Sequence, residues 1–223
     1  MIDIEDLQFH YADGDFRLDI PRLRVYQGER VAVVGPSGSG KTTLLNLIAG
    51  IARPQSGRIS TGATDILALD DGKVRDFRIE NIGLVFQEFE LLEYLDVLDN
   101  VLLPYRINSS LRLDAAVVQR ARDLLDSVGI GDKHDRHPEH LSQGEKQRAA
   151  VCRALLVKPP LLLADEPTGN LDPMNKDRVL DILLAYASDN RATLVTVTHD
   201  RNLLDRFERI VDFEQFLGRV QGH

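Results

Sequence analysis

The chain has 223 residues, of which 43% are hydrophobic and 28% are charged, and its formal net charge is −8. This length is sufficient for one α/β core with a subdomain, and the acidic balance argues against a dedicated nucleic-acid surface. No apolar run approaches the length of a membrane span, and the opening MIDIED lacks the basic and apolar regions of a signal peptide. We therefore expect a soluble, cytoplasmic protein that touches a membrane only through a partner.

Short strand-like runs and turns alternate over residues 1–34, and a further strand-like piece follows at 57–60. These pieces predict an antiparallel sheet laid on the core of the protein. Between them, residues 13–15 together with Asp19 lack the ligand spacing and the terminal glutamate of a calcium loop. We interpret residues 13–15 as a hairpin turn.

A phosphate-binding loop is the first chemical motif along the chain. Residues 35–42 read GPSGSGKT, which fits G-x-x-x-x-G-K-[ST], between an apolar strand-like run at 31–34 and a helix-like run at 43–49. The glycines let backbone N–H groups and the positive end of the helix face an anion. Lys41 then adds a charge at the β/γ oxygens, and the Thr42 hydroxyl binds Mg²⁺. The alternative is an ordinary Gly/Ser turn with a chance lysine.

Gln87 ends a strand-like run that begins at Ile82. Its amide is expected to reach Mg²⁺ or an attacking water, while its backbone begins a mobile segment. A surface glutamine without a role is the alternative.

Helix-like sequence dominates the middle of the chain. It includes an apolar face that starts after Asp114, a good cap, and stops at Gly129. The pattern predicts one domain, in which residues 88–157 form a helical subdomain and residues 1–87 and 158–223 form the nucleotide-binding core with its β subdomain.

Residues 141–148, which read LSQGEKQR, carry a second anion site. Ser142 and Glu145 fit a capping box that starts a helix, although any helix can begin in this way. A helix N-terminus with the flexible Gly144 also binds anions. Because one loop already cradles the phosphates, we expect this second site to face the nucleotide of another subunit.

Three histidines, at 134, 137 and 140, precede this stretch at three-residue intervals. Pro138 interrupts any helix there, and no cysteine or carboxylate completes a convincing metal site, so we favour a connector loop. The only cysteine, Cys152, excludes an internal disulfide and is expected to be a buried small hydrophobe.

Two carboxylates end an apolar run at 161–166. A buried strand that delivers acids at its carboxyl end places them at the edge of a parallel sheet where α/β folds bind ligands. Asp165 would hold Mg²⁺, directly or through its water, and Glu166 would polarise an attacking water as general base. Taken alone, the pair could equally belong to a helix-capping turn.

His199 follows a strand-like run of mainly β-branched residues at 193–198. Its imidazole is expected to hydrogen-bond a γ-phosphate and to respond to its loss. The alternative is a histidine that caps the helix expected after Asp200.

Six motifs therefore follow one another in order: the phosphate loop, Gln87, residues 141–145, residues 161–166, Gly169-Asn170-Leu171-Asp172, and His199. This order resembles that of the ATP-binding-cassette ATPases, and the match covers nearly the whole chain. The family pattern is phosphate loop, glutamine loop, signature, magnesium strand, dimer-contact loop and switch histidine. Each motif alone is weak or moderate, whereas six in the correct order are very specific.

The resemblance implies an α/β fold: a P-loop NTPase (RecA-like) core with an antiparallel β subdomain and an inserted α-helical subdomain. It implies ATP and Mg²⁺ as cofactors. The implied nucleotide-binding residues are Tyr11, Gly35, Pro36, Ser37, Gly38, Ser39, Gly40, Lys41, Thr42, Thr43, Ser142 and Gly144; the implied catalytic residues are Lys41, Gln87, Glu166 and His199; and the implied metal ligands are Thr42, Gln87 and Asp165. Tyr11 would stack on adenine, unless it is an exposed strand aromatic. Asp172 would contact the opposite subunit, unless it only begins the next helix.

The sequence of residues 164–172, ADEPTGNLD, resembles that found in the group of lipoprotein-release, macrolide-export and cell-division ATPases. We therefore expect an ATPase that forms a homodimer around two ATP and drives a separate transmembrane permease, as an exporter or an extruder of lipoproteins or other envelope substrates. It would be peripheral on the inner face of the cell membrane and would not bind nucleic acid. Gln143 and Glu145 depart from the usual signature, but Ser142 and Gly144 are intact, so activity is expected to survive.

Two alternatives remain open. One is a mechanical coupler that acts on a membrane protein without transport, which ATPase motifs do not distinguish from a transporter. The other is a soluble cassette ATPase of DNA repair or translation. Such proteins usually carry a coiled-coil or zinc insertion or two tandem cassettes, which this sequence lacks.

Overall fold

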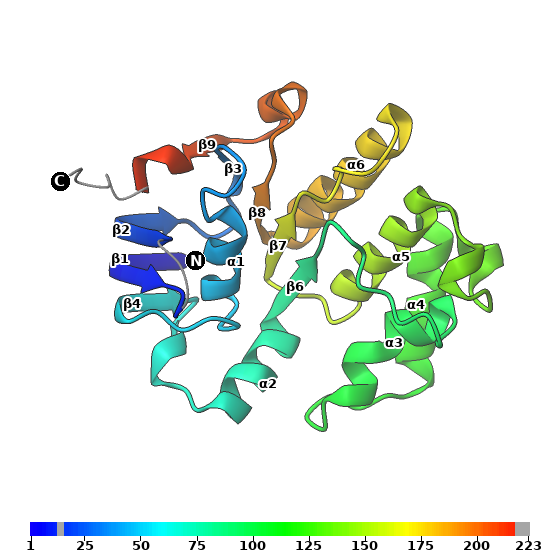
Figure 1. Ribbon diagram of the computed structural model, residues 1–223. Helices are drawn as coiled ribbons and strands as arrows, with labels where there is room; N and C mark the ends of the chain where they lie inside the picture. The colour runs from blue at the N-terminus through cyan, green and yellow to red at the C-terminus, as the bar shows by residue number, and fades with distance from the viewer. Residues whose placement is uncertain (13–15, 217–223) are drawn as a thin grey trace.

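A computed structural model describes residues 1–12 and 16–216 of the chain, arranged as two sheets and a group of helices (Figure 1). The predicted turn at residues 13–15 lies outside the described residues. One sheet has the strand order β2-β1-β4-β5, and its pairs are antiparallel as expected. Its strands are β1 (Ile2–His10), β2 (Arg17–Val25), β4 (Ser56–Thr61) and β5 (Thr64–Asp65).

The second sheet is parallel and has the order β6-β7-β8-β3-β9. Its strands are β3 (Arg30–Val34), β6 (Ile82–Val85), β7 (Leu161–Asp165), β8 (Thr193–Val197) and β9 (Arg209–Asp212). The near-continuous apolar sequences of β3, β7 and β8 suit a sheet that is covered on both faces. Because neighbouring parallel strands end at the same edge, the chain that follows β3, β6, β7 and β8 is brought together there.

The described part of the chain also contains six α-helices: α1 (Lys41–Ile48), α2 (Asp71–Asn81), α3 (Val97–Ile107), α4 (Ala115–Ser127), α5 (Gln143–Leu155) and α6 (Pro173–Asn190). The expected Asp114 cap is confirmed, because its side chain accepts a hydrogen bond from the Val117 N–H at the start of α4. Gly129, at φ 73°, follows the end of that helix. The residues after Asp200 form a 3-10 turn, Arg201–Arg206, in place of an α-helix.

Three apolar cores hold these layers together. One joins the antiparallel sheet, α1 and the parallel sheet, so that α1 lies between the two sheets (Figure 1). A second joins the parallel sheet to α5 and α6, and a third lies among α3, α4 and α5. Helix α5 therefore contributes to both the second and the third core, and it links the helical group to the main sheet.

The structure also shows the positions of the histidines and of the single cysteine singled out in the sequence. His134 and His137 bond separate backbone carbonyls, of Gly131 and Glu93, and the segment contains two 3-10 turns, as a connector loop would. Cys152 is fully buried. Within residues 1–12 and 16–216, no helix is long and apolar enough to cross a membrane.

Candidate active site

A cleft of about 590 Å³ lies at the edge where the parallel strands end. Its lining combines the phosphate loop, Gln87, the two carboxylates and His199, which are far apart in sequence: Tyr11, Phe16, Gly35, Ser37, Gly38, Gly40, Lys41, Thr42, Thr43, Gln87, Asp165, Glu166, Val197 and His199. Most of the site residues predicted from the sequence are thus brought into one cavity, and Phe16 and Val197 are additions.

The lysine of the phosphate loop forms hydrogen bonds to the backbone of the same loop. Lys41 Nζ donates to the carbonyl oxygens of Gly35, at 2.9 Å, and Pro36, at 2.7 Å. The Ser39 N–H donates to the Pro36 carbonyl at 3.3 Å, and the Ser39 side chain is buried. Pro36 and Ser39 therefore shape the loop, whereas Lys41 and the glycines face the cleft.

Gly40 is required by both conformation and space. Its φ is 95°, and a Cβ at this position would stand 2.4 Å from the ring of Phe16. Only glycine combines a positive φ with so close an approach. The ring of Phe16 therefore packs directly against the turn that begins α1.

Aromatic side chains form one wall of the cleft. Tyr11 donates to or accepts from the Thr43 hydroxyl at 2.9 Å, and its ring centroid lies 5.8 Å from that of Phe16 and 4.8 Å from that of Phe9. Tyr11 is 46% exposed, so its ring is held in place while still open to a ligand. An aromatic wall of this kind suits a flat base.

Asp165 is a half-buried acid of the site. Burial raises the pKa of the Asp165 carboxyl, and the charge of Glu166 adds to this effect, while a hydrogen bond from Thr42 and the charge of Lys41 oppose it. The Asp165 carboxylate and the Thr42 hydroxyl therefore lie next to each other in the cleft. These are the hard oxygen donors that Mg²⁺ prefers when phosphates supply the remaining ligands, so the residues present fit this ion.

Glu166 and His199 form a pair. His199 Nδ1 lies 2.9 Å from Glu166 Oε1, and the His199 N–H donates to the other oxygen at 3.4 Å. The Glu166 side chain is only 14% exposed and its backbone has φ 46°, a conformation that the N–H bond to Val197 O stabilises. The cap after His199 is the side chain of Asp200, so His199 is not the capping residue.

Gln87 is exposed at the rim of the cleft and lies beside the loop that follows Glu166. A Cβ built on Gly169 would stand 3.3 Å from the Gln87 amide nitrogen. The Gln87 side chain therefore lies beside Gly169 and lines the same cleft as the two carboxylates, and its contact with Mg²⁺ or water stays a prediction.

Ser142 and Gly144 begin α5 and, within the described residues, do not line this cleft. The predicted capping box is present: the Glu145 N–H donates to Ser142 Oγ at 3.4 Å, and the Ser142 N–H donates to the Glu145 carboxylate at 2.8 Å. Gly144 packs against Asn175, where a Cβ would stand 2.6 Å from that side chain.

Lys133 contacts Glu145, one of the two residues that depart from the usual signature, and neutralises its charge. Burial alone would raise the pKa of the Glu145 carboxyl, but hydrogen bonds from Lys133 and Ser142 outweigh it and lower the pKa to about 2. Helix α5 is also tied to α6, because Arg148 donates to Asn175 at 2.7 Å and Asn175 donates to Asp172 at 2.6 Å. The sequence contained no signal for the contacts of Lys133 with Glu145 and of Arg148 with Asn175, since each joins residues that are far apart along the chain.

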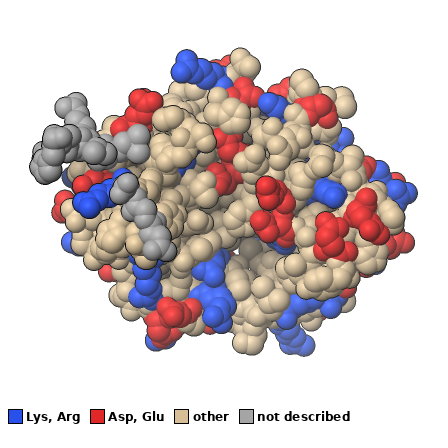
Figure 2. Space-filling model, in the orientation of Figure 1, with Lys and Arg blue, Asp and Glu red and all other residues tan. Residues whose placement is uncertain are grey.

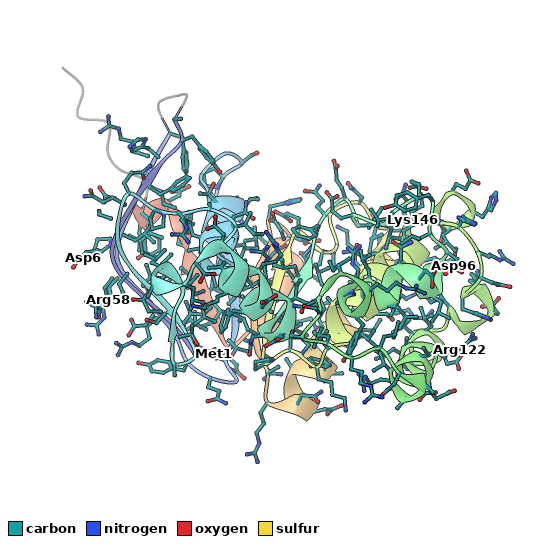
Figure 3. The ribbon with its side chains drawn as sticks, turned by 90° about the horizontal axis from the view of Figure 1, so that it is seen from below. Met1, Asp6, Arg58, Asp96, Arg122 and Lys146 are labelled. Atoms are coloured by element: carbon teal, nitrogen blue, oxygen red, sulfur yellow. The ribbon has the colours of Figure 1, made fainter. Side chains whose placement is uncertain are left out.

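The charge pattern of one face is mixed. Figure 2 shows acidic and basic side chains interspersed over both sheets and the helices. Figure 3 places Asp6 and Arg58 at the end of the molecule formed by the antiparallel sheet, and Asp96, Arg122 and Lys146 at the helical end.

A model of the ABC transporter family matches residues 18–169, which is more than half of the chain. The chain belongs to the ABC transporter family. Curated relatives agree with this assignment. The lipoprotein-releasing system ATP-binding protein of Geobacter metallireducens is 41% identical over 218 residues, which cover 95% of this chain and 96% of that protein. The macrolide export ATP-binding/permease protein of Rhodopirellula baltica is 41% identical over 214 residues. This chain spans 31% of its length.

Solved ABC structures share the fold. The dimeric structure of the ATP-binding cassette MJ0796 bound to ADP and Pi is 33% identical, with a TM-score of 0.86 over 94% of this chain and 93% of that one. A second dimeric structure of the same cassette is 34% identical, with the same TM-score. The predicted resemblance and fold class are thereby confirmed, and the protein is an ATP-binding, ATP-hydrolysing subunit of this family.

Proposed function

We propose that two copies of this ABC ATPase enclose two ATP molecules head to tail and that the resulting motion drives a separate membrane permease. The observation that supports the proposal is the division of the site. Lys41, Asp165 and Glu166 share one cleft, whereas Ser142 and Gly144 lie on α5 outside its described lining. A two-fold axis would bring Ser142 and Gly144 of one copy over the nucleotide of the other.

Six residues of the cleft have a defined role in this proposal. Lys41 binds the β- and γ-phosphates. Thr42 and Asp165, with Gln87, hold Mg²⁺, which supplies charge neutralisation when it is bound. Glu166 takes a proton from the attacking water. His199 is oriented through Nδ1 by Glu166, so its Nε2 is the nitrogen that contacts the γ-phosphate.

The mechanical step follows from the loss of that phosphate. While the γ-phosphate is present, it joins the phosphate loop of one copy to α5 of the other, and the closed dimer is favoured. Hydrolysis removes the contact and the dimer opens. We propose that residues 88–157 move as a unit in this cycle, with the remaining core as the frame.

A groove of about 230 Å³ is the surface we propose for the permease. It lies among α2, β6, α3 and α5 and is mostly apolar, with Ile107 on its wall and charged Arg78, Glu90 and Arg153 around it. Ile107 is 62% exposed. A short amphipathic segment of the permease fits this chemistry and would hold the ATPase at the inner face of the cell membrane.

The relatives suggest the substrate class. Proteins named for lipoprotein release and macrolide export are about equally similar to this chain, which supports a permease that exports or extrudes lipoproteins or other envelope substrates. A force-transmitting coupler without transport is the second candidate. A soluble ATPase has less support, because the curated relatives cited above are named for lipoprotein release and for macrolide export with a permease.

The test is affinity purification of a Glu166→Gln variant from gently solubilised native membranes in the presence of ATP. The variant is expected to hold ATP without turning it over and to bring down a multi-span membrane protein in a fixed ratio. Ile107→Asp in the same background is the matched control, and it should release the membrane protein while ATP binding is kept. Recovery of the Glu166→Gln variant only from the soluble fraction would contradict the permease proposal.

A further inference from the structure

The chain directly after Gln87 is held in an unusual backbone conformation. Phe89 has φ 60° and Glu90 has φ 51°, and two consecutive side chains in the left-handed region are uncommon, above all for a bulky residue such as phenylalanine. The Glu90 N–H donates to the Glu88 carbonyl at 2.6 Å, which closes a γ-turn around Phe89. A γ-turn with positive φ at its centre is rare and strained.

Arg153 of α5 holds both strained residues. Its Nη2 donates to the Phe89 carbonyl at 2.7 Å, and its Nη1 donates to the Glu90 carbonyl. The planar guanidinium can satisfy two adjacent carbonyl oxygens at once, which an ammonium group on a flexible chain does less well. Burial lowers the pKa of Arg153 to about 10, so its charge is kept at neutral pH.

A second side chain of α5 holds the other end of the same segment. Gln147 Nε2 donates to the Phe86 carbonyl at 3.4 Å and to the Pro167 carbonyl at 2.7 Å. Gln147 is fully buried. Gln87 therefore lies between the Phe86 carbonyl and the turn at 88–90, and both accept hydrogen bonds from side chains of α5.

We propose that Arg153 is a positioning residue for Gln87. It holds the turn at 88–90 in its strained form, and this form sets where the Gln87 amide stands in the nucleotide cleft. Strained backbone persists only when surrounding contacts hold it in place. The two hydrogen bonds from the Arg153 guanidinium to the Phe89 and Glu90 carbonyls, the Arg153 fork, are such contacts. The inference rests on the role in holding Mg²⁺ that the proposed function gives Gln87.

The arrangement also couples α5 to the cleft within one subunit. The helix that begins with Ser142 and Gly144 ends near Arg153, so a shift of α5 moves the turn that follows Gln87. Glu90 and Arg153 line the apolar groove as well, and a segment docked there touches the same pair. Removal of the fork lets the turn relax toward ordinary φ values and displaces the amide.

The test compares ATP hydrolysis by Arg153→Lys with that of the wild type and of Arg122→Lys. Arg122 lies on α4 at the edge of the helical end, away from the turn (Figure 3). Arg153→Lys keeps the charge and loses the fork, and it is expected to lower kcat about tenfold while the Kd for ATP changes less than about twofold. Arg122→Lys should leave both constants unchanged.

A second variant that relieves the backbone strain distinguishes a positioning role of Arg153 from a role in packing alone. Glycine adopts positive φ readily, so Glu90→Gly in the Arg153→Lys background is expected to restore most of kcat. Gln87→Ala combined with Arg153→Lys should be no slower than Gln87→Ala alone. An unchanged kcat in Arg153→Lys, a loss that Glu90→Gly does not restore, or additive effects with Gln87→Ala would each overturn the inference. Full activity of Gln87→Ala would overturn the role of Gln87 in the proposed function instead.

Discussion

Lys133→Ala tests the ion pair at the start of the signature helix. Lys133 contacts Glu145, and the two side chains are 22% and 16% exposed. The carboxyl of Glu145 has its pKa lowered from 4.5 to about 2, a difference equivalent to roughly 3 kcal/mol from all its partners together. Lys133 supplies part of this total, and solvent screens the pair, so we expect the variant to lose about 1–2 kcal/mol of unfolding free energy at pH 7.

The pH dependence gives the sign of the effect. A carboxyl whose pKa is lower in the folded state stabilises the fold above its unfolded pKa, and this contribution is lost as pH falls from about 4.5 toward about 2. The difference between wild type and Lys133→Ala in urea unfolding should therefore be largest at neutral pH and shrink in acid. Lys146→Ala, on the same helix, is the control and should behave like the wild type.

A double-mutant cycle isolates the pair. With Glu145→Gln in place, Lys133→Ala is expected to have little further effect, because no carboxylate then remains to neutralise. Equal unfolding free energies for the wild type and Lys133→Ala at pH 7, or an effect of Lys133→Ala that persists in the Glu145→Gln background, would refute the reasoning.

Three further predictions concern single positions. Tyr11→Ala should raise the Kd for ATP by roughly five- to a hundredfold through lost stacking, while Tyr11→Phe keeps most affinity; equal values in calorimetry would contradict this. Gly40→Ala should abolish ATP binding and lower stability by about 1 kcal/mol or more, because a methyl group would meet Phe16; normal nucleotide binding would count against it. Asp114→Ala should lower the unfolding free energy by about 1 kcal/mol through loss of the α4 cap, with ATPase activity unchanged.

Local patterns allowed much of the fold to be predicted. The phosphate loop, the capping box at Ser142 and the Asp114 cap each depend on residues within a few positions of one another, so their sequences carry the whole signal. The acids at the end of β7 were predictable for the same reason, since an apolar strand of the right length precedes them. The family pattern then supplied the order in which these pieces work.

Contacts between distant residues could not be predicted in this way. Nothing near His199 indicates that its ring pairs with Glu166, and nothing near Gly40 indicates Phe16. The fork from Arg153 joins residues more than sixty positions apart and holds a backbone conformation that Phe89 and Glu90 do not favour by themselves. Such contacts depend on strand order and helix packing, which become visible only in three dimensions.

The central claim is that ATP joins two copies of the chain. The most direct measurement is the molar mass of Glu166→Gln in solution by light scattering, with and without ATP and Mg²⁺, beside the same variant carrying Ser142→Arg. The account predicts a change from the monomer mass of 25.0 kDa to about twice that value with ATP, and no change when Ser142→Arg blocks the signature. A monomer at saturating ATP, or a dimer that Ser142→Arg leaves intact, would contradict it.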